Sequence, residues 1–216
     1  MFNLLIVKAM KKMLKFFRGN FFRLMVVGLL SGLFSQGLTL AQSKWQVDKA
    51  HSSVKFSVQH LVISEVEGSF RSFDGSIVSK NDDFTDAVID FTVDVNSINT
   101  DNDMRDNHLK GEDFFNAAKY PKMTFKSKSF KKVSGNKYEL VGDLTIRDVT
   151  KTVKFDVTYG GTVKDPYGNI KAGFKATTVI NRFDYGLKWN AVTEAGGAVV
   201  DKDVNVSLKL EFAKVQ

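Results

Sequence analysis

The chain has 216 residues, no cysteine and a formal net charge of +7. A chain of this length buries roughly 70% of the surface that it exposes when unfolded, so it needs no disulfide to fold. The lack of cysteine excludes thiol catalysis and cysteine-ligated metals. Six of the 31 basic residues and none of the 24 acidic ones lie in residues 1–42, which leaves 25 basic against 24 acidic residues in the remainder. This near-neutral remainder argues against nucleic-acid binding, because it offers no basic surface.

The N-terminal segment has the three parts of a secretory signal peptide. A basic start is followed by an apolar run from Leu24 to Leu40 and by the small-residue exit Thr39-Leu40-Ala41. The run of 17 residues is diluted by glycine and falls short of the ~20 needed to span a bilayer, so an uncleaved anchor is the less favoured alternative. We therefore predict a signal peptide over 1–41, cleavage near Ala41, and a periplasmic or secreted domain over 42–216 that has no stable membrane insertion.

The predicted mature chain is dominated by strict alternation of apolar and polar residues, which is typical of strands with one buried face. Turn residues such as Gly160-Gly161 and the segment 165–169 separate the alternating runs. A change of parity between Phe70 and Phe73 indicates a bulge or a sharp bend. The pattern predicts eight or nine antiparallel strands, which close most easily into a barrel or a sandwich. They are expected at 44–48, 52–61, 65–79, 86–95, 122–131, 137–147, 151–160, 170–181 and 203–214.

Residues 97–121 break the alternation and predict a short helix near 101–110. Thr100 with Asp103 resembles a capping box, and Gly111 is suited to end the helix. A turn or a second short helix carrying Phe114 and Phe115 is expected to follow.

The sequence contains no clear catalytic or metal-binding motif. His51, His60 and His108 fall in different predicted elements and share no metal-binding spacing, so we expect no metal site. The segment from Asp101 to Glu112 resembles a calcium loop only superficially, because Arg105 takes a ligand position and an aspartate stands where the sharp turn needs glycine. No nucleophile elbow or phosphate-binding loop is present, and no cofactor is expected.

The apolar face itself has two interpretations. An eight-stranded barrel either fills its interior with side chains or holds one small ligand, and a period of two does not distinguish these cases. Phenylalanines are abundant on the predicted strands, and aromatic rings line an apolar tunnel as readily as they fill a core.

The mature chain resembles the YceI-like polyisoprenoid-binding family from about Trp45 to Phe212. The resemblance rests on ordered motifs along the whole domain: Asp48-Lys49-Ala50-His51-Ser52-Ser53-Val54-Lys55-Phe56, Val58-Gln59-His60-Leu61, Gly68-Ser69-Phe70, Asp74-Gly75, Thr100 with Arg105-Asp106-Asn107-His108-Leu109, Asp113-Phe114-Phe115, Tyr120-Pro121, Gly142-Asp143-Leu144-Thr145-Ile146 and Arg182-Phe183-Asp184-Tyr185-Gly186. Asp148 replaces the glycine usual in the family, for which we expect only a local change of turn.

The resemblance implies an all-β, eight-stranded antiparallel lipocalin-like barrel with a short helical insertion near residues 100–116. It also implies a non-enzymatic protein that binds a long amphiphile, such as an isoprenoid quinone, a polyprenyl lipid or a fatty amide. Arg105 and His108 are expected near the head group or in structural roles, and Phe114 and Phe115 as a lid or an anchor. The expected lining is Phe56, Val58, His60, Phe70, Phe73, Ile89, Phe91, Val93, Phe125, Leu144, Ile146, Phe155, Val157 and Phe174.

Two alternatives stay open at this point. A small barrel enzyme acting on a hydrophobic substrate would need an inward-facing polar residue with a tuned pKa, and His60 is the visible candidate. A stress-response or interaction module with a solidly packed core would need no cavity. Neither alternative, nor the carrier, requires a particular oligomeric state, and a homodimer is compatible with each.

Overall fold

The computed structural model describes residue 11, residues 42–193 and residues 197–215. Apart from Lys11, the predicted signal peptide and its cleavage site lie outside the described residues. Within the described part of the chain, no helix is long and apolar enough to cross a membrane.

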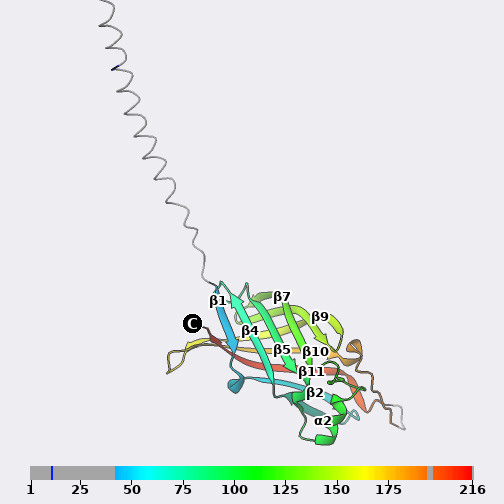
Figure 1. Ribbon diagram of the computed structural model, residues 1–216. Helices are drawn as coiled ribbons and strands as arrows, with labels where there is room; N and C mark the ends of the chain where they lie inside the picture. The colour runs from blue at the N-terminus through cyan, green and yellow to red at the C-terminus, as the bar shows by residue number, and fades with distance from the viewer. Residues whose placement is uncertain (1–10, 12–41, 194–196, 216) are drawn as a thin grey trace, which may run out of the picture. The chain divides into compact units, whose positions relative to one another are not determined.

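The described domain consists mainly of strands (Figure 1). The strands are β1 (Ser43–Val47), β2 (Ser53–His60), β3 (Ser64–Phe70), β4 (Phe73–Ser79), β5 (Val88–Asp94), β6 (Ile98–Asn99), β7 (Lys122–Ser134), β8 (Lys137–Ile146), β9 (Val149–Lys164), β10 (Ile170–Asn181) and β11 (Val200–Lys214). The helix α2 spans Asp103–Lys110, and single 3₁₀ turns lie at Lys49–His51, Val95–Ser97 and Arg182–Tyr185.

These strands form a closed antiparallel barrel with eight positions, which confirms the predicted fold class. The order of hydrogen-bonded neighbours runs β1-β4-β5-β7-β8-β9-β10-β11, and β11 closes the ring by pairing with β1. β11 pairs through its C-terminal part with β1 and through the rest with β2, so β1 and β2 share one barrel position. β3 and β4 share another, because β3 pairs with β2 and β4 pairs with β1. The short β6 adds two residues to β3.

The break between β3 and β4 lies at Arg71 and Ser72, where the change of parity predicted a bulge or bend. The predicted capping box is wrong, because the N-cap of α2 is Asn102, whose side chain accepts a hydrogen bond from the backbone N–H of Arg105. Gly111 is the C-cap, as predicted.

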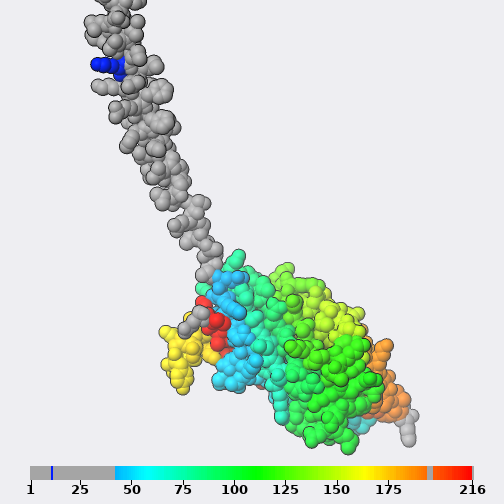
Figure 2. All heavy atoms as spheres, viewed as in Figure 1, coloured from blue at the N-terminus to red at the C-terminus, as the bar shows by residue number. Residues whose placement is uncertain are grey.

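The antiparallel order places the connecting segments at two opposite ends of the barrel. The turn 61–63, the segment 95–121 with α2, the turn 147–148 and the segment after β10 lie at one end, which we call the open end. The connections 80–87, 135–136 and 165–169 lie at the other, which we call the closed end. Figure 2 shows the green α2 segment and the yellow β9–β10 hairpin far apart on the surface, in agreement with this division.

Glycine lets phenylalanine rings cross the inner wall of the barrel. At Gly142 on β8, a Cβ atom would overlap the Phe125 ring and lie 2.5 Å from the carbonyl oxygen of Lys126. The absence of a side chain at this position therefore makes room for a ring from the neighbouring strand β7.

The closed half of the interior is filled by seven aromatic residues that we call the aromatic plug. Phe84 comes from the β4–β5 connection, has a positive φ of 61° and is 1% exposed. Its ring lies 5.2 Å from the ring centroids of Trp45 and Phe174 and 5.6 Å from that of Tyr159. Edge-to-face and tilted contacts at such distances stabilise a core beyond the burial of apolar area. The plug consists of Trp45, Phe84, Phe130, Tyr138, Tyr159, Phe174 and Phe212.

The connection that carries Phe84 is tied down by a carboxylate. Asp86 accepts hydrogen bonds from the Ser79 hydroxyl and from the backbone N–H groups of Lys80 and Asn81. The hydrogen bond from Ser79 is the main reason that the pKa of Asp86 lies below its ordinary value. The Tyr138 hydroxyl also donates to the carbonyl oxygen of Asp83, 3.0 Å away. This hydrogen bond joins β8 to the β4–β5 connection beside the plug.

Candidate functional site: an apolar cavity in the open half of the barrel

The open half of the barrel contains an internal cavity of about 180 Å³, which we call the inner cavity. Its wall is formed almost entirely by apolar side chains, which come from β2, β3, β5 and β7 to β11, from α2, and from the segments that follow α2 and β10. An apolar cavity of about 150 Å³ stays free of water and accommodates a hydrocarbon ring, so this space suits a hydrocarbon ligand.

The boundary between cavity and plug falls along each strand. On β8, Leu144 lines the cavity whereas Tyr138 belongs to the plug. On β10, Ile180 lines the cavity whereas Phe174 belongs to the plug. The inward-facing side chains of one strand therefore line a cavity in one half of the barrel and fill the interior in the other half.

A second cavity of about 200 Å³, the outer cavity, adjoins the inner one at the open end. The two cavities share the lining residues Phe56, Val58, Leu109, Phe114 and Val200. The outer cavity also has polar groups in its wall, namely Thr100, Arg105, His60 and His108. An amphiphile needs this arrangement, because its tail gains from apolar burial while its head group needs hydrogen-bonding partners.

Arg105 is fixed by hydrogen bonds to Thr100 rather than by an ion pair with Asp106. Its Nε donates to Thr100 Oγ1 at 2.7 Å, and its Nη2 donates to the Thr100 carbonyl oxygen at 2.7 Å. The buried carboxylate of Asp106 accepts from the Thr100 N–H and hydroxyl. Since these contacts use only part of the guanidinium, Arg105 is positioned structurally and still offers donors at the outer cavity.

His108 lies between two aromatic rings at the end of α2. Its ring centroid is 5.0 Å from that of Phe114 and 5.6 Å from that of Trp189, both edge to face. Its Nε2 is 3.4 Å from Asp113 Oδ2. Phe115 contacts Phe70 edge to face at 5.9 Å and lines the inner cavity. The phenylalanine pair after α2 thus anchors this segment to the barrel and also forms part of the cavity wall.

The segment after β10 is held by the buried guanidinium of Arg182. Arg182 donates to the carbonyl oxygens of Leu187, Trp189, Val200 and Asp201 at 2.6–3.0 Å. Burial lowers the pKa of Arg182 from its ordinary value. These bonds fold the segment over the open end, where Leu187 and Val200 line the inner cavity and Trp189 lines the outer one.

Tyr185 is a polar residue of the inner wall. Its side chain is 2% exposed, and burial, helped by the charge of Asp184, raises the pKa of its phenol to about 12. The hydroxyl therefore stays protonated over the physiological range and can act as a hydrogen-bond donor.

Most of the predicted lining residues lie around the two cavities. The inner cavity is lined by Phe56, Val58, Phe70, Phe91, Val93, Phe125, Leu144, Ile146 and Phe155, and the outer one by His60. Phe73, Ile89, Val157 and Phe174 pack in the core away from both cavities. Arg105, His108 and Phe114 line the outer cavity, and Phe115 the inner one. The contacts that these residues make with a ligand are predictions.

The enzyme alternative receives no geometric support at His60. The hydrogen bond at this residue runs from the Ser64 hydroxyl to the His60 carbonyl oxygen and leaves the imidazole ring uninvolved. A catalytic histidine is commonly oriented by a third group that is hydrogen-bonded to its ring. In the described part of the chain, no carboxylate or hydroxyl is hydrogen-bonded to that ring.

Several lining residues were not predicted, for two different reasons. Val54, Val206 and Leu208 share the inward parity of their strands, so the alternation itself could have identified them. Arg182, Leu187 and Trp189 lie outside regular strands, where no periodicity marks a buried side chain. For this segment, the family motif at residues 182–186 was the available signal.

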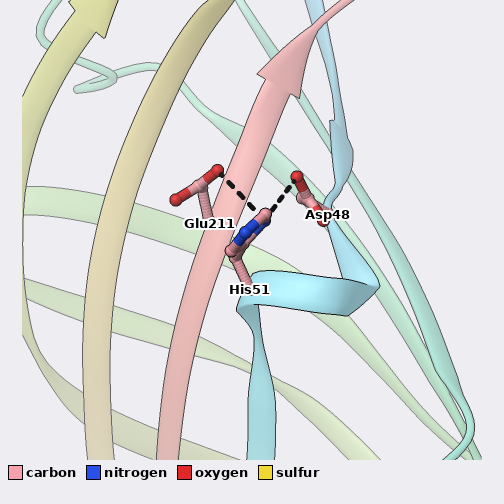
Figure 3. A group of neighbouring side chains, drawn as sticks. All are labelled: Asp48, His51 and Glu211. Atoms are coloured by element: carbon pink, nitrogen blue, oxygen red, sulfur yellow. Dashed lines mark hydrogen bonds and ion pairs between the residues drawn. The ribbon is translucent and has the colours of Figure 1, made fainter. Parts of the chain in front are cut away.

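A cluster of ionisable side chains lies on the outside of the barrel, where the turn after β1 meets β11 (Figure 3). His51 Nδ1 lies 3.0 Å from Asp48 Oδ2 and 3.8 Å from Glu211 Oε1. Three ligand-capable atoms so close together resemble a metal site, although we predicted none. However, Lys171 Nζ lies 2.6 Å from Asp48 Oδ2 and 3.3 Å from Glu211 Oε1. The ammonium supplies the positive charge between the two carboxylates, so the geometry is that of an ion-pair cluster.

Comparison with known proteins agrees with this architecture. The family model described as "YceI-like domain" matches residues 45–212. The UPF0312 protein SAB2563 of Staphylococcus aureus is 42% identical over 167 residues, which cover 77% of this chain and 95% of that protein. The crystal structure of the Campylobacter jejuni YCEI protein matches with a TM-score of 0.63 and 34% identity, covering 78% of this chain and 96% of that one.

A more distant structure, at 17% identity, shows likeness of fold alone. It is described as a polyisoprenoid binding domain from Saccharophagus degradans implicated in plant cell wall breakdown. It matches with a TM-score of 0.57 and covers 79% of this chain and 98% of that one. The family match spans nearly the whole barrel, from β1 to β11, and the chain belongs to the YceI-like domain family.

Proposed function

We propose that this protein is a non-enzymatic binding and carrier protein for a long amphiphile with an isoprenoid or fatty tail. It acts in the periplasm or outside the cell, after removal of residues 1–41. The observation that carries the proposal is the apolar inner cavity, joined to an outer cavity that contains Arg105, His60 and His108. The Saccharophagus degradans domain with the same fold is described as polyisoprenoid binding, which supports the choice of ligand class.

The physical basis of such a carrier is simple. An apolar tail in water exposes surface at a cost of about 25 cal/mol per Å². Enclosure in the open half of the barrel removes that cost without any covalent step. The polar groups of the outer cavity then compensate the partial desolvation of the head group, which distinguishes amphiphiles from plain hydrocarbons.

The direct experiment is to purify the protein from the exported fraction of its native host and analyse an organic extract by mass spectrometry. We expect a long-chain amphiphile in stoichiometric amount, and an N-terminal residue close to position 42. The variant Leu144→Trp fills the inner cavity and is expected to lose the ligand while remaining folded. Val133→Trp, an exposed position at the closed end, is the matched control and should retain it. An empty wild-type barrel without affinity for quinones, polyprenyl lipids or fatty amides would contradict the proposal.

A further inference from the structure

The interior of the barrel offers a ligand only part of its length, because the aromatic plug fills the closed half. Phe174 stands at the centre of the plug, with ring contacts to Phe84, Tyr159, Phe130 and Phe212 at 5.2–6.3 Å. Its side chain is 9% exposed. The rings come from several strands and from the β4–β5 connection, so they cross the interior rather than line it.

The plug is a fixed part of the fold in this structure. Phe84 is anchored by the hydrogen bonds that Asp86 accepts, and the Tyr138 ring stacks on Phe130 with a centroid distance of 4.9 Å. Small residues flank Phe174 on β10, where Ala172 and Ala176 are 1% and 5% exposed. Displacing one ring would leave its neighbours without their contacts, and densely packed aromatic clusters resist such displacement.

The volume of the two cavities sets the size of what they can enclose. The inner cavity measures about 180 Å³ and the outer about 200 Å³. A dry apolar cavity of about 150 Å³ holds one benzene ring, so the two together hold on the order of a dozen carbon atoms. A polyprenyl tail of many isoprene units is much longer than this.

We infer that the aromatic plug, centred on Phe174, is a floor that limits how much of an apolar tail the barrel encloses. This inference rests on the proposed function and refines its ligand class. Affinity rises with tail length only until the tail reaches the plug, because further carbons push the head group out of the outer cavity and add no affinity. The preferred ligands are amphiphiles whose tail reaches the plug while the head group still lies in the outer cavity.

The test is a series of primary fatty amides from about six to about eighteen carbons, titrated by calorimetry or by the fluorescence of Trp189, which lines the outer cavity. Each newly enclosed methylene should tighten binding by about fourfold, the factor that corresponds to ~0.8 kcal/mol per buried CH₂. We expect the wild-type affinity to level off near about a dozen carbons.

Two variants should move this break in opposite directions. Phe174→Ala removes the ring at the centre of the plug and should shift the break to tails longer by about six carbons, the size of the lost ring. Leu144→Phe adds bulk to the inner cavity and should shift the break to shorter tails. Val95→Ala, which removes a fully buried apolar side chain that lies neither in the plug nor in the wall of either cavity, is the control and should leave the break unchanged.

The outcomes separate the inference from the proposed function. If no amide of any length binds wild-type protein, and no quinone or polyprenyl lipid does either, the proposed function fails. If amides bind and affinity rises through the longest tail, the plug is not a floor and the inference is overturned. A break that stays in place in folded Phe174→Ala protein also overturns it. If Phe174→Ala does not fold, Leu144→Phe decides, since a break that it fails to shorten is equally contradictory.

Discussion

Lys171 on β10 and Asp48 after β1 form an ion pair with a distance of 2.6 Å between Nζ and Oδ2, although they lie 123 positions apart in the sequence. Both side chains are mostly buried, with 16% and 19% of their surface exposed. Glu211 on β11 also contacts Lys171. Lys171 therefore links β10 both to the turn after β1 and to β11. Removal of either partner leaves the other charge with reduced compensation.

The pair predicts a defined loss of stability in acid. The hydrogen bond from Lys171, followed by that from His51, lowers the pKa of Asp48 below its ordinary value of 3.8. A lowered pKa means that the stabilisation is complete above pH 3.8 and is lost as the pH falls below it. Asp48→Asn should reduce the free energy of unfolding at pH 7 by about 1–2 kcal/mol and flatten its decline below pH 4.

Urea denaturation of both proteins between about pH 2.5 and 7 measures this effect. The hydrogen bond to Asp48 raises the pKa of Lys171 above its ordinary value of 10.5. The stabilisation that Lys171 provides is therefore complete below pH 10.5 and is lost only as the pH rises above that value. A parallel decline of both proteins in acid would contradict the prediction. A rise of the wild-type Tm with added Zn²⁺ would show that the cluster takes a metal ion instead.

Gly142→Ala is expected to destabilise the barrel by about 1–3 kcal/mol, because overpacking forces neighbouring groups to shift. The added methyl group would meet the Phe125 ring and a backbone carbonyl of β7, which cannot both withdraw. Gly173→Ala is a suitable control on another barrel strand, since a Cβ there has no atom within 4 Å. Thermal unfolding of the two variants measures the difference. Equal Tm values would show that the inner wall at β8 can accommodate the added methyl group.

Val62→Asn is expected to stabilise the protein by about 0.5–1 kcal/mol. Val62 lies in the β2–β3 turn with φ of 65°, a left-handed conformation that is unfavourable for β-branched residues and tolerated by asparagine. Its side chain is 66% exposed, so little burial is lost. Val179, which is 59% exposed and regularly paired with β11 on strand β10, provides the control. Val179→Asn should give no gain, because asparagine disfavours strands. A lower Tm for Val62→Asn would indicate that this valine makes a stabilising contact.

Arg182→Lys is expected to loosen the segment that covers the open end. A lysine ammonium cannot donate hydrogen bonds to all four carbonyl oxygens that Arg182 binds. The remaining carbonyl oxygens must bind water or stay unpaired. We expect a loss of about 2–3 kcal/mol in the free energy of unfolding. Hydrogen exchange of the Leu187 and Val199 amides, which are hydrogen-bonded within this segment, should accelerate more than that of β8. Unchanged protection at both amides would show that the segment is held by other contacts.

The alternation of the sequence predicts the barrel because the inward positions are set locally on each strand. Val54, Phe91 and Phe155 are examples whose burial follows from parity alone. Alternation does not predict which inward residues face a void, since Leu144 and Tyr138 lie on the same face of β8. That distinction depends on what enters from elsewhere, above all Phe84.

Phe84 shows why the plug escaped prediction. It lies in a connection rich in polar residues, where a buried ring is not expected, and its burial depends on the turn that Asp86 and Ser79 hold in place. Similarly, Arg105 gives no sign in the sequence that it bonds to Thr100 rather than to a neighbouring carboxylate. Such partners are set by tertiary geometry, not by local pattern.

The pairing of β11 has a consequence for the order of folding. This strand spans residues 200–214 and is hydrogen-bonded to β1, β2 and β10. The barrel therefore cannot close until β11 has been synthesised, and its closure joins residues separated by more than a hundred positions. Contacts of such high sequence separation slow folding, because the entropy of loop closure is lost before they form. If the chain is exported as we propose, this late closure keeps it in the unfolded state that translocation requires.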